Sequence, residues 1–211
     1  MIPVRVLAVR YLANAAPTLL CALGAPADFP ALAMVTTDCD DATYFALDEA
    51  TKAARVRVVY ARSFYAGAAN ASTPHAGEVI GILAGPTPAD VRSGMAAVLE
   101  TLTRVGFCEA DGVPYFAQTV SRVGSFLSAE ADVPEGTALA YLIAPPLEAV
   151  YALDAALKAA DVRLAKFYAP PSETNFGGGL LSGSRSAGEA ACAAFAAAVA
   201  ETAARPVENG G

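Results

Sequence analysis

The feature that most constrains this chain is an internal repeat. Residues 46–57 read ALDEATKAARVR and residues 152–163 read ALDAALKAADVR, which are identical at nine of twelve positions. Upstream of these segments, ALAMV at 31–35 matches ALAYL at 138–142. Self-similarity on this scale indicates a duplicated structural unit. Because the chain has 211 residues, each copy has the size of a small domain. We therefore predict two homologous domains, residues 1–107 and residues 108–211.

Both halves show the same order of patterns. An alternating segment (4–12 and 116–127) predicts a strand, and a more apolar segment (31–37 and 138–144) predicts a buried strand. A helix of about twelve residues follows, at roughly 42–54 and 147–160, and then a strand, a long loop, another strand and an Ala-rich helix. The predicted fold class is α+β, an α/β sandwich in which a small, mainly antiparallel sheet is flanked by helices.

The first helix of each half carries an acid and a lysine four residues apart. In the first half, Asp48 precedes Lys52 on the face opposite the apolar residues. Asp154 and Lys158 repeat this pair in the second half. Such a spacing brings opposite charges together on a helix surface, so an i,i+4 ion pair is the simplest interpretation of both lysines.

Composition excludes several classes of partner. A net charge of −7 and a pI near 4.7 leave no basic surface for nucleic acid. The sequence has no uninterrupted apolar stretch of the roughly 20 residues that a membrane span needs. Because 55% of the residues are nevertheless hydrophobic, we expect burial between subunits. The four cysteines are scattered without a CxxC pair, which is typical of a reduced cytosolic protein.

Longer strings resemble a known family. The segment ALAYL…EAVYALDAALKAADVRLAKF at 138–167 closely resembles the bacterial microcompartment domain, and residues 31–60 carry a variant of it. Four further strings narrow the match to the EutL family of ethanolamine-utilisation shell proteins: DDATYFALDEATKAA, SFYAGAAN, HAGEVIGILAGP and APPSETNF. The resemblance covers about residues 28–203.

This resemblance implies an architecture and a location. It implies two tandem, circularly permuted microcompartment domains, which form homotrimers that mimic hexamers. Such trimers tile edge to edge with other shell proteins in a microcompartment shell in the cytoplasm. The edge lysines of the family correspond to Lys52 and Lys158. A compact ammonium that reaches carbonyl groups of a neighbouring tile suits that role.

An acidic run is the main candidate for ligand binding. Asp40 and Asp41 lie where a strand meets a helix, and Glu78 begins an apolar strand. Either aspartate can cap the helix, and Glu78 can simply face solvent. In the EutL family, the matching positions, together with Phe107 and Ser182, line a small pore in each subunit that accepts ethanolamine. Carboxylates suit its ammonium group, and a neutral partner suits its hydroxyl.

Two long Gly-rich loops, about 64–77 and 170–183, hold corresponding places in the two halves. Loops of this length in a compact domain are usually functional or mobile. In the family they surround a central opening of the trimer and gate it. The backbone freedom for that motion is expected from Gly67, Gly177, Gly178 and Gly179.

No catalytic or cofactor motif is predicted. The chain has one histidine, His75, and lacks a nucleophile motif, so a metal site and a catalytic triad are not expected. Gly177–Gly179 lack the GK[ST] of a phosphate loop. The function that the resemblance implies is a structural shell protein with a gated central pore and no cofactor, not an enzyme. Two alternatives stay open: a tandem shell protein of a different microcompartment, and a cytosolic pair of ligand-sensing regulatory domains.

Overall fold

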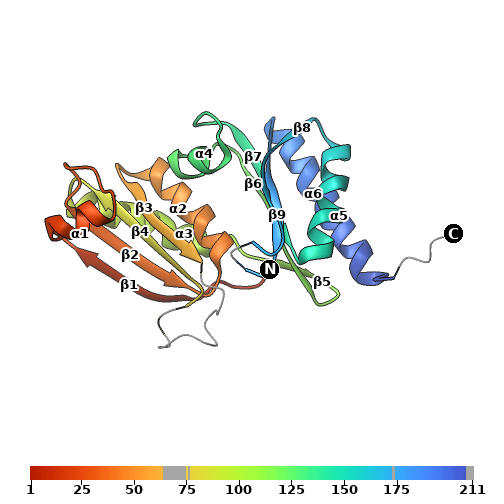
Figure 1. The fold of residues 1–211 in the computed structure, drawn as a ribbon, viewed down its shortest axis with the longest axis horizontal. Helices are drawn as coiled ribbons and strands as arrows, with labels where there is room; N and C mark the ends of the chain where they lie inside the picture. The colour runs from red at the N-terminus through yellow and green to blue at the C-terminus, as the bar shows by residue number, and fades with distance from the viewer. Residues whose placement is uncertain (64–74, 76, 173, 208–211) are drawn as a thin grey trace. The chain divides into compact units, whose positions relative to one another are not determined.

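The computed structural model describes residues 1–63, 75, 77–172 and 174–207, and these form two compact units (Figure 1). The first unit comprises Pro3–Gly106 and the short segment Gly124–Leu127. The second comprises Met1–Ile2, Phe107–Val123 and the residues from Ser128 onward. The chain therefore passes to the second unit after Gly106 and returns briefly to the first.

The first unit is a four-stranded antiparallel sheet of order β1-β2-β4-β3 with two long helices. The helices α2 and α3 pack against one face of this sheet. Its elements in chain order are β1 (Val6–Leu12), α1 (Pro17–Ala22), β2 (Ala31–Thr37), α2 (Asp40–Ala53), β3 (Arg57–Ser63), β4 (Val79–Gly85) and α3 (Pro88–Leu102).

The second unit repeats this arrangement. Its sheet has the order β5-β6-β7-β9-β8, in which β6, β7, β9 and β8 take the places of β1, β2, β4 and β3. The predicted α+β fold with duplicated, mainly antiparallel sheets is therefore confirmed. The elements are β5 (Cys108–Ala110), β6 (Val113–Val120), the later part of α4 (Ser125–Ala131), β7 (Ala138–Ala144), α5 (Pro146–Ala159), β8 (Val162–Tyr168), β9 (Gly177–Gly183) and α6 (Arg185–Ala204).

Small residues let the helices lie close to each sheet. A Cβ at Gly81 in β4 would stand 2.7 Å from the side chain of Leu47 in α2, so glycine is needed there. On the other face of the first sheet, Leu20 and Leu23 from the α1 segment pack over Leu32 and Ile82. In the second unit, Phe195 of α6 is fully buried beside the alanines of α5. No helix in the described part of the chain has the length and apolar character to span a bilayer.

Two sequence predictions about elements are wrong. The strand predicted at 116–127 ends at Val120, and the sequence from Ser125 forms α4. The predicted flexible loop at 170–183 is shorter, because Gly177–Gly179 belong to β9 and pair with β7 and β8. A Cβ at Gly178 would overlap the carbonyl oxygen of Leu142, so these glycines permit close strand packing rather than motion. Gly67 lies outside the described residues.

Candidate functional site

The predicted acidic residues lie at one end of the first sheet. Helix α2 begins with Asp40 and Asp41 in its first turn, and Cys39 is the N-cap residue without a side-chain cap. The capping role considered from sequence is therefore wrong, although both acids lie at the positive end of the helix dipole. The Asp40 carboxylate instead accepts from the Asp41 N–H (2.9 Å) and from the Ser63 hydroxyl (2.7 Å).

Ser63 connects Asp40 to the chain at Glu78. Its Oγ lies 2.7 Å from Asp40 Oδ2 and 3.4 Å from the Glu78 carbonyl oxygen. The Glu78 N–H donates to the Thr37 carbonyl at 2.8 Å, which holds the start of β4 beside the end of β2. The structure thus gathers Asp40, Ser63 and Glu78 at one sheet end. Ser63 was not predicted from the sequence, because only the pairing of β3 with β4 brings it there.

A second layer of contacts fixes the turn that carries the acids. Asp38 accepts from the backbone N–H and from the Nε of Arg5, both at 2.7 Å. Behind it, the buried hydroxyls of Thr37 and Thr43 share a hydrogen bond of 2.7 Å, and Thr43 also donates to the Cys39 carbonyl. These contacts hold a rigid turn rather than a mobile acidic loop. Among the described residues, no group of three or more His, Cys, Asp or Glu side chains is placed to hold a metal ion.

The thiol inside this turn is unreactive. Burial raises the pKa of Cys39 far above its ordinary value, and the carboxylates of Asp41, Asp40 and Asp38 raise this pKa further. A hydrogen bond with the backbone of Ala42 opposes this shift only in part. Because the thiolate is the nucleophile, Cys39 stays an inert thiol at neutral pH.

We expect Cys39 to react with a thiol reagent such as DTNB at pH 8 much more slowly than Cys21, which is exposed. The difference should be about tenfold or more, because the Cys39 thiolate is scarce at that pH. Cys21→Ala should reduce the amplitude of the fast phase of the reaction, and Cys39→Ala should leave it intact. A fast phase that disappears in Cys39→Ala would contradict this picture.

The remaining two predicted pore residues belong to the second unit. Phe107 packs against Phe116 and Phe176, with ring centroids 5.5 and 5.6 Å apart. Ser182 lies in β9, is buried, and its hydroxyl is 3.5 Å from the Arg163 carbonyl. A single pore lined by Asp40, Asp41 and Glu78 together with these two residues stays a prediction.

The acidic cluster is not duplicated. The two copies can be aligned strand by strand, with β2, β3 and β4 matching β7, β8 and β9. In this alignment Asp40 corresponds to Pro146, Ser63 to Ala169 and Glu78 to Phe176. None of these three side chains can accept a hydrogen bond. The first unit alone therefore carries this polar chemistry.

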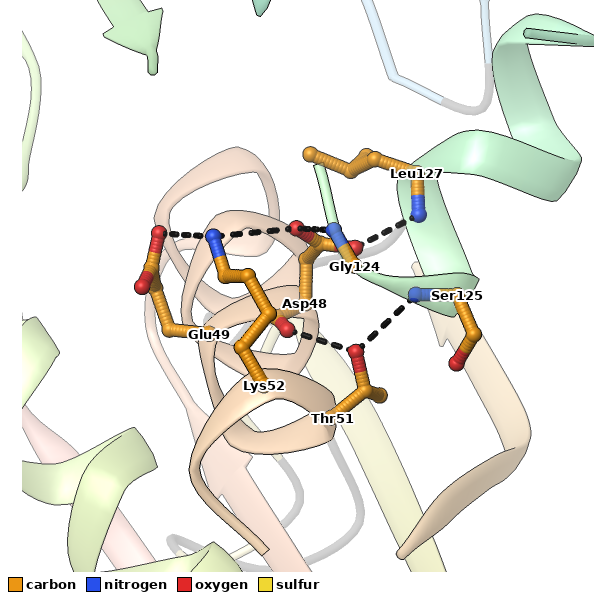
Figure 2. Close-up of polar contacts among 7 residues, drawn as sticks. All are labelled: Asp48, Glu49, Thr51, Lys52, Gly124, Ser125 and Leu127. Atoms are coloured by element: carbon orange, nitrogen blue, oxygen red, sulfur yellow. Dashed lines mark hydrogen bonds and ion pairs between the residues drawn. The ribbon is translucent and has the colours of Figure 1, made fainter. Parts of the chain in front are cut away.

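A buried carboxylate on α2 is the other polar feature of the first unit (Figure 2). Asp48 is fully buried, and its carboxylate accepts from the N–H groups of Gly124 and Leu127, both at 2.8 Å. The Thr51 hydroxyl oxygen accepts from the Ser125 N–H at 3.1 Å. These bonds satisfy backbone donors at the start of α4, which have no partner within that helix. We call this contact of α2 with Gly124–Leu127 the α2 clamp.

The two predicted Asp–Lys pairs are both present, but their surroundings differ. Lys52 Nζ lies 3.5 Å from Asp48 Oδ2 and also pairs with Glu49, and its side chain is 26% exposed. Lys158 Nζ lies 2.6 Å from Asp154 Oδ2, and those side chains are 75% and 62% exposed. The sequence prediction that Asp48 lies on an outward face is therefore wrong, because the α2 clamp covers it.

Comparison with known proteins identifies the family. A model of the BMC domain matches residues 31–114. The bacterial microcompartment shell protein EutL of Clostridium perfringens is 60% identical over 206 residues, which are 96% of this chain and 95% of that protein. The chain belongs to the EutL family of bacterial microcompartment shell proteins. The crystal structure of the ethanolamine utilization protein EutL from Leptotrichia buccalis agrees with a TM-score of 0.95 at 57% identity, and covers 99% of this chain and 98% of that one.

Membership in the EutL family confirms several sequence predictions. The chain is a structural shell protein of an ethanolamine-utilisation microcompartment, and it is not an enzyme. A more distant structure, the trimeric bacterial microcompartment shell protein PduB, shares the fold with a TM-score of 0.78 at 20% identity. That alignment covers 95% of this chain and 89% of that one.

Proposed function

We propose that this EutL-family chain forms a trimeric, pseudohexameric tile whose acidic cluster binds the ammonium group of ethanolamine. The observation that carries the ligand proposal is the gathering of Asp40, Ser63 and Glu78 at one sheet end. An ammonium ion has three donors and no acceptor, so carboxylate and carbonyl oxygens that converge from three elements suit it. Asp41 adjoins this group, and Phe107 and Ser182 complete the proposed pore.

The proposed trimer is supported by the duplication of the domain within the chain and by the similarity of the fold to that of PduB. Two copies of one domain in a chain allow three chains to build a ring of six similar units. PduB, which shares the fold, is trimeric. We include the gated central pore of the family in this proposal, but we assign no hinge to Gly177–Gly179, because they lie in a strand.

Edge contacts between tiles are proposed for Lys52 and Lys158. Lys158 is the more available of the two, since its side chain is 75% exposed and pairs with an exposed aspartate. Lys52 is held by Asp48 and Glu49. Within one chain, the two lysines thus differ in how tightly acidic partners hold them.

The ligand proposal is tested by calorimetric titration with ethanolamine. The double variant Asp40→Asn with Glu78→Gln keeps shape and removes two charges. We expect it to weaken binding at least tenfold, because a hydrogen bond to a charged group contributes about 1.5–3 kcal/mol. Asp38→Asn is the matched control, since Asp38 is engaged with Arg5, and it should bind as the parent does.

Unchanged ethanolamine affinity in the double variant would exclude this site. Titration with propane-1,2-diol and with ethylamine separates the alternatives. Preference for the diol over ethanolamine would show that the acidic cluster does not recognise an ammonium group. Binding of ethylamine with reduced affinity would indicate that the ammonium group contributes most of the binding free energy and that the hydroxyl group contributes the rest.

A further inference from the structure

The Asp40 carboxylate is held at both of its oxygens. Its Oδ1 accepts from the N–H of Asp41, the next residue of α2, at 2.9 Å. Its Oδ2 accepts from the hydroxyl of Ser63, the last residue of β3, at 2.7 Å. In the described part of the chain, Ser63 is the residue outside α2 that donates to this carboxylate. The direction in which the carboxylate points is therefore set by the sheet as well as by the helix.

The sheet fixes the place of the Ser63 hydroxyl. Ser63 pairs with Val79 in the β3–β4 register, next to Glu78. Its Oγ lies 3.4 Å from the Glu78 carbonyl oxygen, which is longer than its contact with Asp40. A serine hydroxyl has one proton, and a short bond to a charged acceptor is the stronger of the two. The proton is therefore directed at Asp40.

The second copy shows that the fold does not need this hydroxyl. The counterpart of Ser63 is Ala169, which is exposed and follows β8. The sheet of the second unit nevertheless has the matching strand order. The two buried threonines beneath the acidic turn are also alanines there, since Thr37 corresponds to Ala144 and Thr43 to Ala149. The hydroxyls thus occur in the copy that has the carboxylates, and the shared fold is built without them.

We propose that Ser63 is a positioning residue of the ligand site, which raises ethanolamine affinity by orienting the Asp40 carboxylate. This role rests on the proposed function, since it concerns the same site. With Ser63 present, the carboxylate is oriented before the ligand arrives. Without it, Oδ2 loses its partner, and the side chain has to be ordered during binding, which lowers affinity.

The role is tested by calorimetric titration of Ser63→Ala and Ser63→Thr with ethanolamine. We expect Ser63→Ala to weaken binding about threefold to tenfold, because one side chain must be ordered by the ligand. Ser63→Thr keeps the hydroxyl, so its affinity should stay within about twofold of the parent. Far-UV circular dichroism verifies that each variant is folded, as the alanine at the equivalent place in the second copy leads us to expect.

A double-mutant cycle tests whether Ser63 acts through Asp40. In an Asp40→Ala background, Ser63→Ala should weaken binding by less than about twofold, because the group that it orients is gone. Asp40→Ala should fold, since the counterpart of Asp40 is Pro146. Ala169→Ser is the matched control. It adds a hydroxyl at the equivalent exposed place in the second copy and should keep the parent affinity.

The outcomes separate this role from the proposed function. If the parent binds ethanolamine and Asp40→Asn with Glu78→Gln weakens binding but Ser63→Ala does not, the positioning role is wrong and the ligand site stands. Equal losses from Ser63→Ala in the parent and in the Asp40→Ala background would also overturn the role, as would a threonine variant as weak as the alanine variant. A parent that does not bind ethanolamine would refute the ligand site and this role together.

Discussion

Asp48→Ala is expected to lower the free energy of unfolding by about 3 kcal/mol. The substitution leaves the N–H groups of Gly124 and Leu127 buried without an acceptor, and each unsatisfied donor costs about 1–3 kcal/mol. It also removes the carboxylate that faces Lys52. Urea denaturation of the purified variant measures the change.

The repeat provides a matched control for this substitution. Asp154 occupies the same helix position, but its side chain is 62% exposed, so Asp154→Ala should change stability by no more than about 0.5 kcal/mol. Equal effects of the two substitutions would show that the α2 clamp does not stabilise the first unit.

The effect of Asp48 also depends on pH. Burial raises the pKa of Asp48 above its ordinary value of 3.8, and the N–H groups of Gly124 and Leu127 and the charge of Lys52 offset this only in part. At a pH between 3.8 and the raised pKa, the folded chain therefore holds a proton that the unfolded chain has released. The stability that this group contributes is full below pH 3.8 and declines as the pH rises through the raised pKa. The destabilisation by Asp48→Ala should accordingly be larger at about pH 4 than at pH 7.

Gly178→Ala is expected to be the most damaging single substitution in the second unit, with a loss of about 4 kcal/mol or more. Gly178 has φ +149°, and its added Cβ would overlap the backbone carbonyl of Leu142 in the neighbouring strand β7. Neither strand can move aside, because β9 lies between β7 and β8. We expect a large fall in the urea midpoint or loss of soluble protein.

Gly136→Ala isolates the backbone part of this effect. Gly136 also has positive φ, +82°, but no atom lies within 4 Å of its added Cβ. Its cost should be limited to the strained conformation, about 1–2 kcal/mol. If Gly178→Ala were as mild as Gly136→Ala, the close approach of β7 and β9 would not be required for stability.

Local patterns predicted most of the elements, because strands and helices leave periodic signals in the chain. The predicted helix at 147–160 matches α5, Pro146–Ala159. The segment at 116–127 was misassigned, because the apolar residues Phe126 and Leu127 resemble a strand continuation. Their helical conformation instead accompanies the contact of the α4 start with Asp48, a residue distant in sequence.

For a related reason, only part of the candidate site could be predicted from the sequence. Asp40 and Glu78 could be selected as carboxylates beside apolar strands. The third member, Ser63, is an ordinary serine at the end of a strand, and nothing local distinguishes it. Its position against Val79 in the β3–β4 register places it beside Glu78.

The sequence by itself determined that the chain is duplicated, because identical residues at a fixed spacing need no structure to be recognised. It did not determine that the copies differ in exposure. Asp48 and Asp154 occupy the same place in the same motif, yet one is fully buried and the other lies on an open face. Burial depends on what covers a residue, and only the tertiary structure shows that Gly124–Leu127 cover one copy of the helix and leave the other exposed.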